Sequence, residues 1–116
     1  MYRFEYYSPV RGGRLKAMHC MDIPFAFDNL EAGKVYTGTS AAAQVLADQM
    51  SASWVAFARG GNPNHPGIPQ WTAFNMAQRP TMVFSDREAR LVNDPGREER
   101  LALKAIRDAA SPGRTD

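Results

Sequence analysis

Residues 15–29 read LKAMHCMDIPFAFDN, and this stretch decides how the whole chain is interpreted. It places His19 in a loop among small residues, with Asp22 three positions later and a short apolar run behind it. Because histidine takes up and returns a proton near neutral pH, a loop histidine held by rigid flanks is a candidate general base. A single histidine does not establish catalysis, so the rest of the chain has to support the assignment.

The bulk composition is that of an ordinary soluble globular protein. The chain has 116 residues, of which 44% are hydrophobic and 22% charged, and this length allows one domain at most or a piece of one. A net charge of +2 does not favour nucleic acid or a membrane surface as a partner. The arginines of the second half alternate with acidic residues, which indicates a solvated surface of mixed charge.

The single cysteine, Cys20, excludes an intrachain disulfide and a cysteine-based zinc site, and a small packed thiol is its expected role. The first residues show no signal-peptide pattern. No window approaches the roughly 18 apolar residues that a membrane-spanning helix needs. We therefore expect no membrane partner and favour a cytoplasmic location.

Local patterns predict the elements of the first half of the chain. Aromatic residues at period two indicate a strand over residues 2–7, and the glycines at 12–13 favour a turn after it. Pro24 suits the first turn of a short helix or helical turn over residues 23–30, which we expect to pack two phenylalanines, Phe25 and Phe27.

The clearest helix follows Thr39 or Ser40, either of which can cap it, and ends where Gly60-Gly61 offers a left-handed cap. Four apolar residues are spaced so that they share one face of this helix, and we expect that face in the core. They are Leu46, Met50, Trp54 and Phe57. A rigid loop over residues 62–69 follows.

The second half predicts a strand over residues 81–84 and a shorter one at 91–92. Asp94-Pro95 is a good start for a terminal helix with Pro95 at its first position, and Leu103 and Ile106 give that helix a narrow apolar stripe. We expect the ordered part to cover residues 1–110 and the tail at 111–116 to be frayed.

Strands and helices alternate along the chain, which predicts the α/β class. Only two strands are well defined, and they lie near opposite ends of the sequence. Because an isolated two-stranded sheet is marginal in water, we expect a few strands of a larger sheet plus about three helices, incomplete as a domain.

Other side chains offer less chemistry than His19. Ser40 lies in Gly38-Thr39-Ser40-Ala41-Ala42, which lacks the last glycine of a Gly-x-Ser-x-Gly nucleophile turn and follows only a weak strand-like lead-in at residues 35–36, so it is interpreted as a helix cap. His65 lies in a polar turn and is expected to have a surface-loop role.

No metal or organic cofactor is implied by the sequence. A metal site could be assembled from His19, Asp22 and Asp28, but their spacing matches no common metal motif. No glycine-rich phosphate loop follows a strand, because Gly60-Gly61 closes a helix instead. The residues alone therefore indicate part of an α/β protein with one plausible base and no nucleophile.

The order of segments from Tyr2 to Arg100 resembles the C-terminal part of type B carboxylesterases, the group that contains para-nitrobenzyl esterases and, more distantly, cholinesterases. Four features in the same order carry the resemblance. They are the aromatic strand YRFEY at 2–6, AMHCMDIPFAF at 17–27, MSASWVAFARGGNPN at 50–64 and PQW at 69–71. The second is similar to the family motif His-Gly-x-Glu/Asp-[Leu/Ile]-Pro-[Phe/Tyr]-x-Phe, and the third to Met-x-x-x-Trp-x-x-Phe-Ala-x-x-Gly-[Asp/Asn]-Pro-Asn.

The resemblance implies an α/β-hydrolase fold in which His19 is the triad histidine. The family's nucleophilic serine, triad carboxylate and glycine-rich oxyanion loop lie upstream of these motifs and are not in this chain. Asp22 matches the motif carboxylate, which we interpret as a hydrogen-bonding support of the loop and not as the triad acid. Cys20 stands where the family mostly has glycine, a departure expected to tighten or shift the loop.

The resemblance therefore implies a serine esterase that hydrolyses small-molecule carboxylic esters, to which this chain supplies the histidine. We expect the 116-residue chain to be inactive on its own. The alternative is a non-catalytic module derived from an esterase, in which an open sheet edge and apolar faces drive self-association.

Overall fold

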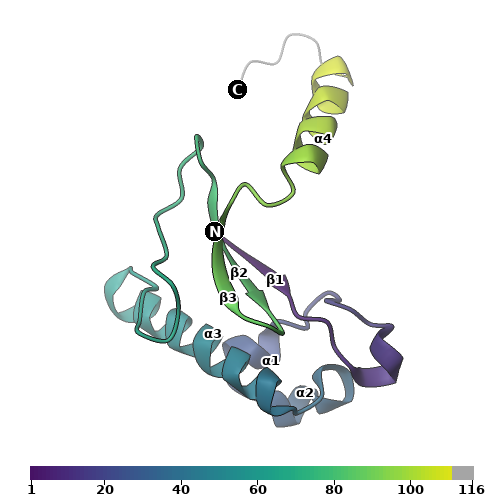
Figure 1. The fold of residues 1–116 in the computed structure, drawn as a ribbon, viewed down its shortest axis with the longest axis vertical. Helices are drawn as coiled ribbons and strands as arrows, with labels where there is room; N and C mark the ends of the chain where they lie inside the picture. The colour runs from purple at the N-terminus through teal and green to yellow at the C-terminus, as the bar shows by residue number, and fades with distance from the viewer. Residues whose placement is uncertain (111–116) are drawn as a thin grey trace.

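A computed structural model of the chain describes residues 1–110, and the tail expected to be frayed at 111–116 lies outside the described residues. Three strands form one sheet in the order β1-β2-β3: β1 (Tyr2–Glu5), β2 (Pro80–Ser85) and β3 (Ala89–Asn93). β1 is parallel to β2, and β2 and β3 form an antiparallel hairpin (Figure 1). The α/β class is confirmed, and the short strand expected at 91–92 is β3.

One face of the sheet is apolar and packs against helices. The register aligns Phe4 with Phe84 and Met82 with Leu91, so their side chains share this face. Phe84 and Met82 are fully buried in the core cluster, and Phe4 and Leu91 pack against it. The strand predicted over residues 2–7 is shorter in the structure: β1 ends at Glu5, where the chain turns away from the sheet.

The opposite face of the sheet is covered by charged side chains. Arg3, Val83 and Arg90 are aligned across the three strands. Glu5 forms ion pairs with both arginines, at 2.9 Å from Arg3 Nε and 3.3 Å from Arg90 Nη2. Val83 is buried although its cross-strand neighbours on this face are Arg3 and Arg90. Long arginine side chains can cover apolar surface while their charged ends stay in water.

The chain between β1 and the long helix folds into three short helical segments. After the short 3-10 segment η1 (Val10–Gly13), α1 (Ile23–Ala26) and α2 (Leu30–Thr37) follow. The short helix or helical turn expected over 23–30 is present as α1, but it ends at Ala26, because the Asn29 side chain caps a new helix by accepting a hydrogen bond from the Ala32 N–H. Residues 35–36, expected as an extended lead-in, are helical for the same reason.

α1 and α2 pack closely because α2 carries a glycine at the contact. A β-carbon on Gly33 would lie 2.5 Å from Pro24 Cγ, so only glycine allows this approach. Phe25 is fully buried, as expected, whereas Phe27 is 78% exposed. The prediction that both phenylalanines pack is therefore wrong for Phe27, because the early end of α1 turns its ring outwards.

The long helix α3 (Ala41–Gly60) follows the sequence prediction closely. Ser40 accepts a hydrogen bond from the Ala43 N–H at 3.1 Å, and Gly61 ends the helix in the left-handed conformation at φ 71°. Leu46 and Met50 are buried, as expected for the core face of α3. Phe57 is 59% exposed, so the core face does not continue to the end of the helix.

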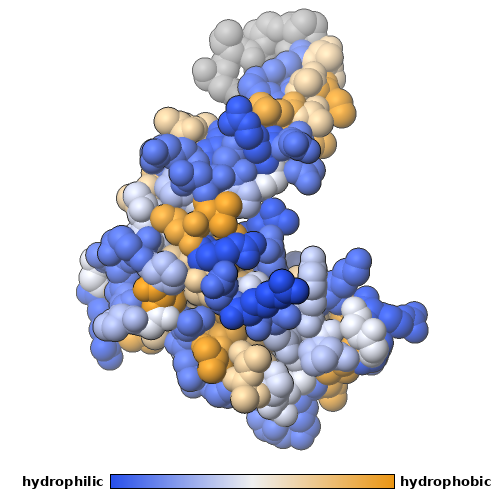
Figure 2. Space-filling model, in the orientation of Figure 1, coloured by the Kyte–Doolittle hydropathy of each residue, from blue (hydrophilic) through white to orange (hydrophobic). Residues whose placement is uncertain are grey.

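The C-terminal helix α4 (Arg97–Ala110) extends away from the sheet and the other three α-helices (Figure 1). It begins at Arg97, so the expected helical start at Pro95 is wrong. None of its residues is buried, and Leu103 and Ile106 are each 67% exposed. Figure 2 shows the resulting apolar stripe along α4. No helix among residues 1–110 is long and apolar enough to cross a membrane.

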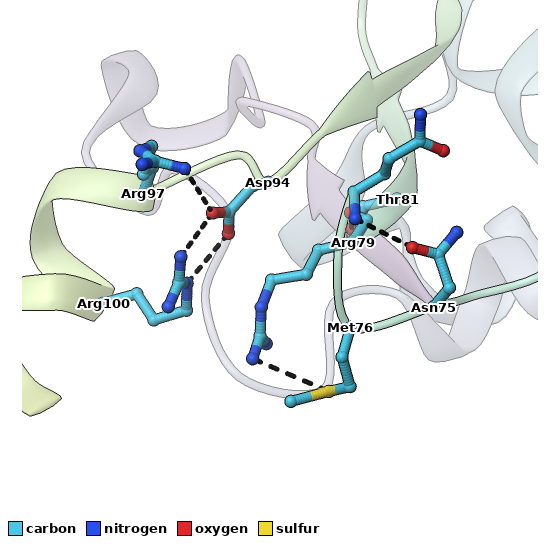
Figure 3. Close-up of polar contacts among 8 residues, drawn as sticks. Asn75, Met76, Arg79, Thr81, Asp94, Arg97 and Arg100 are labelled. Atoms are coloured by element: carbon cyan, nitrogen blue, oxygen red, sulfur yellow. Dashed lines mark hydrogen bonds and ion pairs between the residues drawn. The ribbon is translucent and has the colours of Figure 1, made fainter.

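Asp94 connects the sheet to α4 (Figure 3). Its backbone N–H donates to the Arg79 carbonyl at 3.1 Å, and its carboxylate accepts from Arg100 Nε at 2.9 Å. Arg97 lies 3.8 Å from the same carboxylate. The hydrogen bond from Arg100, assisted by the charges of Arg79 and Arg97, holds the pKa of the Asp94 carboxyl below its ordinary value of 3.8.

Acidification should therefore release α4. A carboxyl with a lowered pKa stabilises the fold above about pH 4, and this stabilisation is lost as the pH falls through the folded-state pKa. We expect Asp94→Asn to cause the same loss of helix at neutral pH, because a helix of this length without buried residues is marginal by itself. NMR chemical shifts of residues 97–110 report helicity. Asp108→Asn is the matched control, since a carboxylate in the last turn opposes the helix dipole. Equal helix loss in both variants would contradict the role of Asp94.

Candidate active site

His19 lies on an exposed turn between η1 and α1. The Met21 N–H donates to the Met18 carbonyl at 3.1 Å, so His19 and Cys20 are the two central residues of a four-residue turn. Within residues 1–110, no group hydrogen-bonds to the His19 imidazole. The ring is therefore free to meet groups from outside this segment.

The turn has a backbone conformation that favours glycine at its third position. Cys20 has a φ of 64°, while His19 is not among the residues with positive φ, and this pattern belongs to a type II turn. Glycine adopts positive φ without steric cost, which explains why the carboxylesterase motif mostly has glycine here. The expectation of a packed thiol is wrong, because Cys20 is exposed.

Asp22 is held by a hydrogen bond from β1. The Tyr2 hydroxyl donates to Asp22 Oδ2 at 2.8 Å. The sequence interpretation of Asp22 as a support of the loop is consistent with this contact. Tyr2 is 37% exposed, and its partial burial, together with the hydrogen bond to Asp22 and the negative charge of that residue, raises the pKa of Tyr2 to about 12.

The core below the turn fixes its position. Met21 is almost fully buried, and the ring centroid of Phe25 lies 4.8 Å from that of Tyr6 and 5.2 Å from that of Phe4. Aromatic pairs of this kind contribute about 0.5–1.5 kcal/mol each beyond the area they bury. The histidine turn is therefore anchored on its C-terminal side to the strand that precedes it.

The other candidate residues have structural contacts. Ser40 caps α3, as expected. The His65 ring accepts from the Gly67 N–H through Nδ1 at 3.1 Å, so its Nε2 carries the proton and donates to the Gln49 carbonyl at 3.1 Å. The side chain of Asn64 forms two hydrogen bonds with the backbone of Trp71: Nδ2 donates to the carbonyl at 2.9 Å, and Oδ1 accepts from the N–H at 2.6 Å. These bonds hold the 62–69 loop against α3, consistent with the loop role expected for His65.

A cavity of about 760 Å³ opens beside α3. Its walls include Tyr2, Trp54 and Trp71, and His19 does not line it. Among residues 1–110, no three histidine, cysteine or acidic side chains are placed to hold a metal ion. His19, Asp22 and Asp28 are therefore not brought together as a metal site.

Tyr2 is the residue that sequence reasoning missed. Its place in an alternating aromatic strand predicted packing, and its ring does pack edge-on against Trp54 with centroids 4.9 Å apart. Its hydroxyl contact with Asp22 depends on how the loop returns to the strand, and no local pattern encodes that. The available signal was the residue type: phenylalanine would pack equally well at this position, so a tyrosine indicates that the hydroxyl has a hydrogen-bond partner.

The chain is similar to a known protein family and to several of its members. The sequence profile of the Carboxylesterase family matches residues 1–103. A phenmedipham hydrolase of Pseudarthrobacter oxydans is 30% identical over 110 residues, covering 90% of this chain and 22% of that protein. The para-nitrobenzyl esterase of Bacillus subtilis is 31% identical over 105 residues, covering 89% of this chain and 21% of that esterase. The chain thus spans about a fifth of the length of these relatives.

Solved structures give the same result. A carboxylesterase of Geobacillus stearothermophilus superposes with a TM-score of 0.72 at 36% identity, over 88% of this chain and 21% of that one. A thermophilic para-nitrobenzyl esterase superposes with a TM-score of 0.76 at 29% identity, over 89% of this chain and 21% of that one. The expectation that the chain is a portion of an α/β-hydrolase fold is confirmed. Residues 1–110 contain three strands and four α-helices, where about three helices were expected.

The turn geometry predicts that Cys20→Gly stabilises the chain. An L-residue in the left-handed conformation costs about 1–2 kcal/mol, and glycine removes this cost while losing some of the gain to its freer unfolded state. We expect the free energy of unfolding to rise by about 0.5–1 kcal/mol, measured by urea denaturation. Cys20→Ala is the matched control because it removes the thiol and keeps the β-carbon. A gain in the alanine variant equal to that in the glycine variant would show that the thiol, and not the backbone, is responsible.

Proposed function

Because the chain belongs to the carboxylesterase family, we propose that it forms the histidine-bearing portion of a serine esterase that hydrolyses small-molecule carboxylic esters. The observation that carries the proposal is the placement of His19. Its turn is anchored by the buried Met21 on one side and by the Tyr2–Asp22 contact, while its ring has no partner within residues 1–110. A base held in place and open to outside groups suits a triad completed by another part of a longer protein.

The proposed chemistry of His19 is general base followed by general acid. The imidazole takes the proton of a serine hydroxyl as that oxygen attacks the ester carbonyl, and gives it to the leaving alcohol. The same ring then activates a water molecule that hydrolyses the acyl-enzyme. The nucleophile, the triad carboxylate and the oxyanion donors would come from the remaining four fifths of a protein the size of the relatives.

The names of the relatives support an ester-type substrate. They include a phenmedipham hydrolase and a para-nitrobenzyl esterase, and both names describe hydrolysis of small organic molecules. In the proposed mechanism, no step calls for a metal ion or an organic cofactor. The acyl and alcohol preferences would be set largely by pocket walls outside this segment.

The decisive experiment starts from the reading frame that carries the chain. We expect it to extend upstream through a Gly-x-Ser-x-Gly sequence, and its full product to hydrolyse a nitrophenyl ester. His19→Ala should lower kcat/KM by about four orders of magnitude or more, because the triad acts as a unit. His65→Gln is the matched control, since glutamine keeps a donor towards the Gln49 carbonyl. The 116-residue chain alone should show no turnover, and turnover by it that His19→Ala abolishes would overturn the proposal.

A second candidate function is that of a self-associating module, and the open apolar surfaces favour it. β1 pairs only with β2 among the described residues, so its other edge is unpaired, and the stripe of α4 is exposed. A stop codon directly upstream of the chain would favour this candidate over the esterase portion.

Self-association predicts a concentration-dependent mass of the 116-residue chain in sedimentation velocity. Ile106→Glu should shift the chain towards monomer, because it places a charge within the apolar stripe of α4. Val45→Glu, at a similarly exposed apolar position on α3, is the matched control and should have little effect. A stable monomer of the unmodified chain at every concentration would exclude this function.

A further inference from the structure

We propose that Tyr2 is a positioning residue for His19, because its hydroxyl holds Asp22 and so fixes the turn that carries the imidazole. This inference rests on the proposed role of His19 as the base. Tyr2 lines the cavity beside α3, which His19 does not line. Its hydroxyl is hydrogen-bonded to Asp22 and not to the imidazole, so its effect on His19 would pass through Asp22.

The hydroxyl of Tyr2 is placed by rigid surroundings. Its ring centroid lies 4.9 Å from that of Trp54 on α3, at an interplanar angle of 78°, and 6.4 Å from that of Phe84 on β2. The backbone of Tyr2 is aligned with Met82 in the parallel pairing of β1 and β2. The donor oxygen is therefore fixed by both the sheet and the long helix.

Asp22 has few other constraints on its side chain. It occupies the N-cap position of α1, yet its carboxylate makes no capping hydrogen bond there. Within the part of the chain that the structure describes, Tyr2 is the single hydrogen-bond partner of this carboxylate, while the Asp22 backbone carbonyl accepts from the Ala26 N–H at 2.9 Å. Loss of the hydroxyl would leave the carboxylate tied only through its own backbone.

The turn depends on this tether because only backbone hydrogen bonds support its two central residues, from the Met21 N–H to the Met18 carbonyl and from the Ile23 N–H to the Cys20 carbonyl. His19 and Cys20 are both exposed, and Cys20 holds an unfavourable left-handed conformation. The buried Met21 fixes the turn from below, and Asp22 fixes it from the side of β1. Two fixed points next to each other determine the direction in which the His19 side chain leaves the backbone.

The chemistry of the contact suits a permanent tether. A hydroxyl donating to an ionised carboxylate forms a hydrogen bond stronger than one between neutral groups. The raised pKa of Tyr2, about 12, keeps its hydroxyl protonated throughout the range in which ester hydrolysis by histidine operates. The tether therefore does not change while the imidazole exchanges protons.

The experiment compares Tyr2→Phe with Tyr6→Phe. Both residues lie near the N-terminus, and each substitution removes one hydroxyl hydrogen bond. Tyr2 donates to Asp22, and Tyr6 donates to the Thr37 carbonyl at 2.7 Å. Tyr6→Phe therefore matches the loss of stability without touching Asp22. Asp22→Ala removes the acceptor, whereas Asp22→Asn keeps a side-chain oxygen that can accept from Tyr2.

Two readouts separate positioning from general destabilisation. In the 116-residue chain, NMR records the ring signals of His19 and amide exchange at residues 18–22. In the product of the full reading frame, steady-state kinetics separate kcat from KM. We expect Tyr2→Phe and Asp22→Ala to shift the ring signals, speed exchange in the turn and lower kcat about fivefold to tenfold with KM nearly unchanged, because a small misplacement of a catalytic group slows the chemical step.

Asp22→Asn should keep most of the rate that Asp22→Ala loses. Tyr6→Phe keeps the ring that packs against Phe25 and loses only the hydroxyl bond to the Thr37 carbonyl, so it should change the ring signals and kcat much less than Tyr2→Phe. Identical ring signals and kcat in Tyr2→Phe and Tyr6→Phe would overturn the inference, even if hydrolysis still depends on His19. Full hydrolysis in His19→Ala would instead overturn the proposed function, and the NMR comparison would then still decide whether Tyr2 holds the turn.

Discussion

The packing of Phe25 against Phe4 and Tyr6 is the contact on which the arrangement of this chain depends. It joins α1 to β1 across the loop that carries His19, with ring centroids 5.2 and 4.8 Å apart. The hydroxyl of Tyr6 continues the connection to the end of α2 through the Thr37 carbonyl. Because the loop begins and ends at this cluster, the histidine turn has a defined place even though its central residues face solvent.

The second constraint is the sheet, which has one face packed against helices and one edge, at β1, without a paired strand among the described residues. β2 is buried along its whole length because β1 and β3 flank it and helices cover one face. The other face carries the ion pairs of Glu5 with Arg3 and Arg90. Exposed ion pairs contribute little to stability, so the core between the sheet and α3 carries most of the fold.

Sequence reasoning succeeded where the signal is local. The ends of α3 were predicted because Ser40 and Gly61 satisfy the terminal backbone groups through their own conformation. It failed where the outcome depends on a partner: periodicity placed Phe57 and Ile106 on apolar faces, but it does not say whether another element covers them. The split between α1 and α2 had a local signal in Asn29, which caps α2, and the apolar run around it concealed that signal.

The candidate site also has features that the sequence predicts and features that depend on the tertiary structure. His19 and the support role of Asp22 came from the motif they share with carboxylesterases, whereas the donor to Asp22 lies on a strand twenty residues earlier and required the tertiary structure. The positive φ of Cys20 explains in physical terms what the motif records as a glycine. In the proposed function, this segment supplies His19 and holds it in position, and the rest of the enzyme supplies the groups with which the imidazole reacts. A triad histidine needs its backbone fixed to within a fraction of an ångström and its ring left free, and a turn held between a buried methionine and a tethered carboxylate meets both requirements.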